Sequence, residues 1–219
     1  MRKEISRLHF LTQDLKNKTH SSLANIACAA GINWLQFRMK NESNTLMRQA
    51  VECKRICEAY NATFIVNDFV DVAIRCGADG VHVGKEDIPV KNVRRIVNDD
   101  FIVGTSSNTL DDVLKAIDDG ADYSGIGPFR FTSTKKNLNP IIGLKGLEKV
   151  MNELSKRNIQ FPLIAIGGIQ LIDVKDILNL GVHGIAVSSA LNLSKSFDET
   201  VKQFLKACHI HSSHKTIIA

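Results

Sequence analysis

Short apolar segments alternate with amphipathic ones along the chain, and this alternation constrains the fold more than any other feature. Each apolar segment is bounded by Gly, Pro, Asn or Asp, a pattern typical of strands buried on both faces. The predicted strands are Leu8–Thr12, Trp34–Arg38, Thr63–Val66, Gly80–Val83, Phe101–Gly104, Tyr123–Ile126, Leu163–Ile166 and Gly184–Val187. The predicted helices between them are Asn44–Ala59, Val70–Cys76, Lys91–Asn98, Thr109–Asp119, Gly143–Arg157 and Leu171–Asn179. Buried strands that alternate with helices indicate a parallel sheet covered by helices.

The length of the chain fits eight strand–helix units. Its 219 residues allow about 27 residues per unit, enough for a short strand, a helix of about 11 residues and two loops. Eight units favour a closed sheet, so we predict an α/β fold with a single (β/α)8 TIM barrel over residues 1–219. Three near-repeats support this, since each reads as a helix that ends at glycine before a strand: Cys76–Gly80, Asp119–Tyr123 and Leu180–Gly184. We expect residues 209–219 to form a flexible C-terminal tail.

Composition and charge indicate which kinds of molecule the protein binds. The longest apolar stretch, residues 161–169, is about half as long as a membrane-spanning helix. No apolar signal sequence follows the charged N-terminus, so the expected compartment is the cytoplasm. The formal net charge is +5, but no basic run typical of a nucleic-acid patch is present. We therefore expect phosphorylated small molecules as partners, and neither nucleic acid nor a membrane.

The five cysteines are scattered and include no C-x-x-C pair. This spacing argues against a disulfide framework and against a structural zinc site, so we expect reduced, mostly buried thiols. A homodimer is compatible with the sequence, although no pattern requires one.

In a barrel of this kind the functional residues lie at the C-terminal ends of the strands. The second strand ends with Gln36, Arg38 and Lys40 at alternate positions, which predicts that all three point inward. Arginine, lysine and an amide together offer hydrogen-bond donors for phosphate oxygens. The alternative is a solvated strand end with no ligand.

The next two strand ends carry carboxylates. Asp68 and Asp71 follow the third strand, and Asp87 follows the fourth. Carboxylate ligands on neighbouring strand ends suit Mg²⁺, which fills its other positions with water and substrate phosphate. Asp68 and Asp87 are the candidate ligands, and the alternative interpretation makes all three aspartates helix N-caps.

Hydroxyl groups and positive charge follow the sixth strand. The segment Gly127–Asn137 includes Thr132, Thr134 and Lys135, which could wrap a pyrophosphate. A long loop of this composition in a compact domain is typically functional or mobile. The alternative is a surface loop with no ligand.

Hydroxyls and glycines follow the remaining strands. The segment Gly104–Asn108 contains Ser106, which either caps a helix or partners the Lys135 segment. Gly167 and Gly168 follow the seventh strand, and Ser188 follows the eighth. These two loops commonly form the phosphate site of a barrel. Two anion sites with a metal site between them suit the joining of two phosphorylated substrates with loss of pyrophosphate.

Taken together, these motifs closely resemble those of the thiamine-phosphate synthase family, from about Leu8 to Leu191. The shared motifs are Gln36-x-Arg38-x-Lys40, Asn67-Asp68 with Asp71, Gly80-Val81-His82-Val83-Gly84-x-Glu86-Asp87, Gly127-Pro128 with Thr132-x-Thr134-Lys135-Lys136, and Ala165-Ile166-Gly167-Gly168-Ile169. The resemblance implies a transferase that joins hydroxymethylpyrimidine diphosphate to a thiazole phosphate, releases pyrophosphate and requires Mg²⁺. It also implies a dissociative substitution, in which the diphosphate leaves first and the thiazole nitrogen captures a pyrimidine-stabilised cation.

The resemblance also implies a role for individual residues. Asp68 and Asp87 are the implied Mg²⁺ ligands. The implied ligands of the pyrimidine diphosphate are Gln36, Arg38, Lys40, Asn67, Ser106 and Lys135. The implied ligands of the thiazole phosphate are Thr132, Thr134, Gly168 and the backbone of Val187 and Ser188. The predicted catalytic residues, which stabilise leaving-group charge and include no nucleophile, are Arg38, Lys40, Ser106 and Lys135.

Some positions depart from the family pattern, namely Met39, Phe69, Lys85 and Phe131. Phe69 stands where an arginine is usual and removes a potential phosphate partner, while Lys85 could restore positive charge nearby. We assign no role to His82, because a histidine within a strand is more often packed than catalytic.

Three other functions compete with the synthase. A thiazole tautomerase shares the barrel but needs an acid/base residue rather than a metal–diphosphate clamp, and the retained Asp68, Asp87 and Thr132-x-Thr134-Lys135 set argues against it. Another phosphate-binding barrel, such as an indole- or ribulose-phosphate enzyme, would share only the fold. A non-catalytic thiamine-phosphate-binding paralogue would be expected to lose the carboxylates or the lysine, and none is lost.

Overall fold

The structure, a computed structural model, describes residues 4–40, 44–131 and 140–210. Its eight parallel strands form a closed barrel in the order β1-β2-β3-β4-β5-β6-β7-β8. The strands are β1 Leu8–Leu11, β2 Trp34–Phe37, β3 Thr63–Asn67, β4 Gly80–Val83, β5 Ile102–Ser107, β6 Tyr123–Ile126, β7 Leu163–Ile166 and β8 Gly184–Val187. The predicted (β/α)8 TIM barrel is confirmed.

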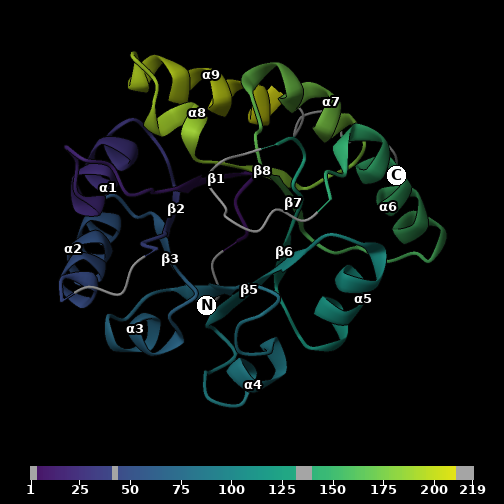
Figure 1. Ribbon diagram of the computed structural model, residues 1–219, viewed down its shortest axis with the longest axis horizontal. Coiled ribbons are helices and arrows are strands. Elements are labelled where there is room, and N and C mark those ends of the chain that lie inside the picture. The colour runs from purple at the N-terminus through teal and green to yellow at the C-terminus, as the bar shows by residue number, and fades with distance from the viewer. Residues whose placement is uncertain (1–3, 41–43, 132–139, 211–219) are drawn as a thin grey trace.

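Helices surround the barrel as an outer ring (Figure 1). They are α1 His20–Ala29, α2 Leu46–Ala59, α3 Val70–Arg75, α4 Val90–Arg94, α5 Leu110–Asp118, α6 Gly143–Lys156, the 3-10 turn η1 Leu171–Asp173, α7 Val174–Asn179, α8 Ser189–Asn192 and α9 Phe197–Ile210. Within the described ranges, no helix combines the length and the apolar character needed to cross a membrane. Helix α9 includes the first two residues of the predicted tail, and residues 211–219 lie outside the described part of the chain.

Strand β5 is longer than predicted. It continues to Ser107, so the hydroxyl cluster that was expected in a loop lies within the strand. The hydroxyls form hydrogen bonds to the neighbouring strands: Ser107 Oγ lies 2.7 Å from Ser124 Oγ, and Thr105 Oγ1 donates to the Val83 carbonyl at 3.1 Å. Helix α5 is instead capped by Thr109. Ser106 is therefore fixed on the sheet rather than on a connecting loop.

Two helices also differ from their predicted extents. The predicted helix over residues 171–179 is divided into η1 and α7, and helix α4 ends at Arg94 rather than near residue 98. The three near-repeats do form the predicted turns, because Gly77, Gly120 and Gly181 have φ values of 69°, 85° and 88°. Only glycine adopts this left-handed conformation without steric cost.

An apolar cluster fills the barrel interior below the C-terminal ends of the strands. Its buried members are Leu11, Trp34, Ile65, Ile102, Tyr123, Ile164 and Ala186. The ring of His9 stacks on that of Trp34, with 4.3 Å between centroids, and burial lowers the pKa of His9 well below its ordinary value. Because strand side chains alternate, the next inward positions, such as Gln36 and Asn67, lie one layer nearer the C-terminal ends of the strands. The inner apolar cluster thus forms the floor beneath the predicted site.

A second, larger core lies between the barrel and the helices. The cysteines are free thiols; four are buried and Cys76 is half-buried, which confirms the prediction of mostly buried thiols. Cys28 on α1 and Cys53 and Cys57 on α2 pack in this core.

Candidate active site

A cavity of about 220 Å³ lies at the C-terminal ends of the strands. Its lining includes residues from both ends of the chain as well as from the middle. The predicted site residues that line it are Gln36, Arg38, Asn67, Asp68, Ser106, Gly168, Val187 and Ser188. The structure therefore brings together residues that are separated by up to about 150 positions in the sequence.

Of the predicted site residues that the structure describes, Lys40 and Asp87 do not line this cavity. Lys40 is exposed and lies three residues beyond the end of β2 at Phe37, so its predicted inward direction stays a prediction. The backbone N–H of Lys40 donates to Asp14 Oδ2 at 3.3 Å. The remaining ones, Thr132, Thr134 and Lys135, lie outside the described residues.

An amide pair forms part of the wall. Gln36 Nε2 donates to Asn67 Oδ1 at 2.7 Å, and the two side chains are buried on adjacent strands β2 and β3. This bond uses one donor of Gln36 and one acceptor of Asn67. Gln36 Oε1 and Asn67 Nδ2 then offer an acceptor and a donor to a ligand.

Arg38 makes the wall electropositive. Burial lowers the pKa of its guanidinium, while the nearby carboxylates of Asp68 and Asp14 raise it. The Arg38 backbone N–H donates to Thr12 Oγ1 at 3.0 Å, and Thr12 Oγ1 lies 2.7 Å from His20 Nδ1. A half-buried guanidinium beside a cavity is suited to bind an oxyanion in a bidentate manner.

The predicted aspartates are not helix N-caps. The N-cap of α3 is Phe69 and that of α4 is Pro89, and Asp71 lies within the first turn of α3. Asp68 lines the cavity with a φ of 68°, an unusual conformation for a residue other than glycine.

Asp87 lies just outside the cavity. Its Oδ2 accepts a hydrogen bond of 2.6 Å from the backbone N–H of Gly84, which does line the cavity. A Cβ placed on Gly84 would lie only 2.9 Å from the same oxygen, so the glycine admits the carboxylate. Among the described residues, no group of three or more His, Cys, Asp or Glu side chains could hold a metal ion.

A polar network ties three strand ends together near the cavity. Asn108 lines the cavity, and its Nδ2 donates to the carbonyl of Gly127. Asp112 Oδ2 accepts from the Asn108 backbone N–H and from Lys85 Nζ, each at 2.8 Å. Lys85 therefore forms an ion pair away from the cavity lining, and the expectation that it replaces the charge missing at Phe69 is wrong.

His82 lines the cavity, although its position within a strand predicts only a packing role. It is buried, lines the cavity, and places Nε2 3.0 Å from Ser106 Oγ and Nδ1 3.1 Å from the Tyr123 hydroxyl. The alternation used for Gln36 and Arg38 also applies to β4, where it predicts that His82 points inward.

Backbone groups form the opposite wall. Gly167 and Gly168 have φ values of 96° and 69°, and a Cβ on Gly167 would lie 2.8 Å from Pro128 Cα. Arg130 donates to the Gly168 carbonyl at 2.9 Å and to both carboxylate oxygens of Asp173 at 2.8 Å. We call this ion pair the Arg130–Asp173 latch. It joins the segment after β6 to the loop after β7.

The hydroxyl of Ser188 forms hydrogen bonds within the protein. Ser188 Oγ donates to the Leu11 carbonyl at 3.1 Å and lies 3.2 Å from Gln13 Oε1. These contacts connect β8 to the end of β1, where the barrel closes. The backbone of Ser188 is thereby held at the rim.

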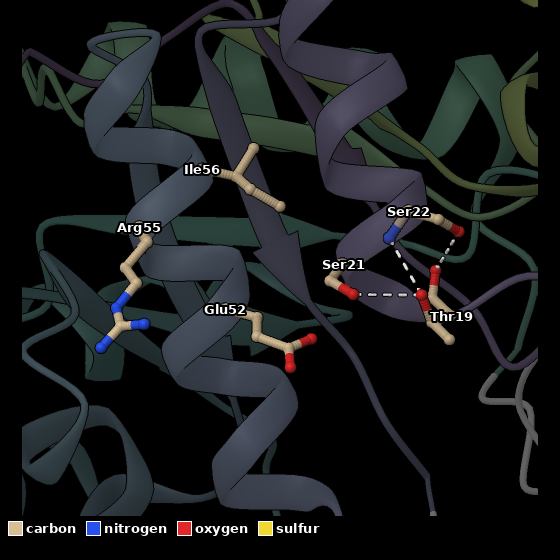
Figure 2. Close-up of a pocket in the computed structure, with 6 residues that line it drawn as sticks. All are labelled: Thr19, Ser21, Ser22, Glu52, Arg55 and Ile56. Atoms are coloured by element: carbon tan, nitrogen blue, oxygen red, sulfur yellow. Dashed lines mark hydrogen bonds between the residues drawn. The ribbon is translucent and has the colours of Figure 1, made fainter.

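A second hollow lies on the outer surface between α1 and α2 (Figure 2). Its hydroxyls belong to the start of α1, where Thr19 Oγ1 accepts from the Ser22 backbone N–H at 3.1 Å. Glu52, Arg55 and Ile56 form the α2 side. The hollow is open to solvent and contains none of the predicted site residues.

Comparisons with known proteins agree with the motifs at the barrel rim. The family model described as thiamine monophosphate synthase matches residues 8–191. The chain belongs to this family. The matched range contains all eight strands and every predicted site residue.

Individual members of the thiamine monophosphate synthase family are similar over most of the chain. The thiamine-phosphate synthase of Phocaeicola vulgatus is 40% identical over 189 residues, which cover 86% of this chain and 91% of that one. The thiamine-phosphate synthase of Bacteroides fragilis is 39% identical over 90% of this chain and 98% of that one. The solved structure of the thiamine phosphate pyrophosphorylase from Pyrococcus furiosus has a TM-score of 0.81 and 31% identity, over 94% of this chain and 96% of that one.

Proposed function

We propose that the protein is a thiamine-phosphate synthase, which joins hydroxymethylpyrimidine diphosphate to a thiazole phosphate and releases pyrophosphate. One observation carries the proposal: the cavity combines Arg38, an amide pair and Asp68 on one side with the backbone of Gly168 and Ser188 on the other. Membership of the family named for this product supports the same reaction.

In this proposal the pyrimidine diphosphate binds to the side-chain wall. Arg38 contacts the diphosphate, and Ser106 donates its hydroxyl to the same group. Gln36 and Asn67 supply the acceptor and the donor left by their mutual hydrogen bond. Lys40 and Lys135 add positive charge to this subsite.

The thiazole phosphate binds to the backbone wall, with Thr132 and Thr134 as further ligands. Glycine at positions 167 and 168 permits a close approach of the phosphate to the main chain. The cavity therefore separates two anions, one on each wall.

Asp68 and Asp87 would hold Mg²⁺. The donor set fits this ion, because Mg²⁺ in enzymes is commonly bound by one or two carboxylates and completed by water and substrate phosphate oxygens. The two aspartates follow adjacent strands, β3 and β4, and one lines the cavity while the other lies against Gly84. When bound, the ion would neutralise negative charge on the diphosphate.

The chain's own residues then act by electrostatics and positioning. Arg38 and the Ser106 hydroxyl stabilise the charge that develops on the departing diphosphate. The pyrimidine-stabilised cation is captured by the thiazole nitrogen, so the reaction requires no protein nucleophile. Apolar lining residues, including Leu11, Ile166 and Ile169, limit the access of water that would otherwise capture the cation.

The test measures pyrophosphate release and thiamine-phosphate formation from the two purified substrates, with Mg²⁺ or with EDTA. Wild type is compared with Arg38→Ala and with Arg157→Ala, a matched control at the exposed C-cap of α6. We expect metal-dependent product from wild type and the control, and a large loss in Arg38→Ala. Binding of both substrates without product would favour a non-catalytic paralogue. Isomerisation of a thiazole phosphate without pyrophosphate release would favour a tautomerase, and either result would overturn the proposal.

A further inference from the structure

Three side chains form a hydrogen-bonded chain across the barrel interior. Tyr123 on β6 reaches His82 on β4, and His82 contacts Ser106 on β5, at distances of 3.1 and 3.0 Å. Tyr123 passes over β5 because Gly104 has no side chain. A Cβ at Gly104 would lie 2.2 Å from Tyr123 Cζ and 2.5 Å from its hydroxyl oxygen. The glycine thus makes the contact between strands β6 and β4 possible.

The direction of the hydrogen bonds follows from the burial of Tyr123. Its side chain is fully buried, and within the described residues its hydroxyl has one hydrogen-bond partner, His82 Nδ1. Burial raises the pKa of Tyr123, so the phenol keeps its proton. A buried O–H without an acceptor is costly, and the phenol therefore donates to Nδ1. Nδ1 carries no proton, and the proton of the neutral imidazole is on Nε2.

This tautomer decides what Ser106 does. His82 Nε2–H donates to Ser106 Oγ, so the hydroxyl oxygen accepts at one position and His82 cannot remove the serine proton. The O–H of Ser106 is left to donate to another acceptor. Ser106 lines the cavity together with Arg38, whose positive charge favours an anion there.

We propose that His82, oriented by Tyr123, is a positioning residue that makes the Ser106 hydroxyl a hydrogen-bond donor to the diphosphate leaving group. This inference rests on the proposed function, because it requires the diphosphate to bind at this wall. It also assigns a purpose to a histidine that would otherwise resemble the base of a nucleophilic serine. The serine here is a donor, not a nucleophile.

The first test is Tyr123→Phe, which keeps the aromatic ring and removes the proton that selects the tautomer. Loss of one oriented hydrogen bond is expected to lower kcat about five- to tenfold with little change in KM. Tyr60→Phe is the matched control, because Tyr60 lies on the surface at the end of α2, and it should match wild type. Wild-type kcat in Tyr123→Phe would overturn the proposal.

A double-mutant cycle separates positioning from packing. Ser106→Ala should lower kcat by more than about tenfold, and adding Tyr123→Phe should then change kcat less than about twofold. If the fold-loss of kcat in the double variant equals the product of the losses in the two single variants, Tyr123 acts independently of Ser106. That result would contradict the proposal. His82→Gln retains an N–H and should keep more activity than His82→Ala, and equal activities would also contradict it.

Nitrogen-15 NMR of histidine-labelled wild-type protein tests the tautomer directly. The expected spectrum shows His82 protonated at Nε2 and not at Nδ1. A proton on Nδ1, or a fully protonated ring, would overturn the proposal even if the enzyme is active. Calorimetric binding of pyrophosphate, expected to be about fivefold weaker in Tyr123→Phe, also requires no turnover. Failure of the synthase reaction is therefore visible separately, in the product assay alone.

Discussion

The two walls of the cavity present different kinds of chemical group. On the β2–β5 side the chemistry lies in side chains, among them Arg38, Asn67 and Ser106. On the β7–β8 side it lies in main-chain groups around Gly168 and Ser188, whose own hydroxyl is bonded to Leu11. A side-chain wall can be changed one functional group at a time. A backbone wall depends on conformation, so its properties are set by φ angles and by the contacts that hold the loop.

The largest expected effect is on the side-chain wall. Arg38→Ala should lower kcat/KM by about 10²- to 10³-fold, because in the proposed function it removes the cation that stabilises the departing diphosphate. Arg38→Lys keeps the positive charge but cannot form the bidentate hydrogen bonds of a guanidinium. Its activity should therefore lie between that of wild type and that of Arg38→Ala. Steady-state formation of thiamine phosphate provides the measurement. A loss below about tenfold in Arg38→Ala would mean that the two walls do not differ in this way.

Gly168→Ala tests the backbone wall. Gly168 and Gly77 both have a φ of 69°, but a Cβ on Gly168 would lie 3.0 Å from Arg130 Cβ whereas a Cβ on Gly77 would meet nothing within 4 Å. Both alanine variants should lose about 1–2 kcal/mol of unfolding free energy. Only Gly168→Ala should raise KM for the thiazole phosphate, by about tenfold. Equal KM values in the two variants would exclude a binding role for this conformation.

Asp173→Asn loosens the latch that supports the backbone wall. Hydrogen bonds from Arg130 hold the pKa of Asp173 below its ordinary value of 3.8. The associated stability is therefore complete above pH 3.8 and is lost as the pH falls through the lower pKa of the folded state. Thermal unfolding should show a steeper loss below about pH 4 in wild type than in Asp173→Asn. Because Arg130 is partly exposed, the difference should stay under about 1 kcal/mol.

The same variant should distinguish the walls kinetically. We expect KM for the thiazole phosphate to rise about threefold in Asp173→Asn, and KM for the pyrimidine diphosphate to stay unchanged. Equal increases in both values would show that the latch supports the whole rim rather than one wall.

Ser188→Ala should have the smallest effect. Its hydroxyl donates to the Leu11 carbonyl, and Asn192 Nδ2 also donates to that carbonyl at 2.8 Å. KM for the thiazole phosphate should change less than about twofold, in contrast to the loss of kcat in Ser106→Ala. A tenfold increase in KM would show that the hydroxyl binds substrate directly.

The fold was predictable because its signal is local. Each buried strand is a short apolar segment that ends at a turn residue, and strands β4, β6, β7 and β8 have the bounds expected from the sequence. Strand β5 was predicted too short, since Thr105, Ser106 and Ser107 read as polar loop residues until their hydrogen bonds to other strands are known.

The site was predictable where the residue type carries the chemistry. Arg38, Asn67 and Asp68 line the cavity as expected. The role proposed for His82 depends on Tyr123 and Ser106, which are 41 and 24 positions away, and on the direction of two hydrogen bonds. The ion pair of Lys85 with Asp112 is equally hidden from the sequence, because it spans 27 positions. Partners so distant in sequence leave no periodic pattern.

The seam of the barrel has a consequence for biosynthesis. Strand β1 pairs with β8, and Asn192 and Ser188 bond to the end of β1. Strand β1 is the first strand to be synthesised, whereas its partner β8 is complete only after Val187 has been added. Until then both outer strands of the nascent sheet expose unpaired backbone groups, which are templates for aggregation. Closure of the seam is therefore a late step that requires nearly the whole chain.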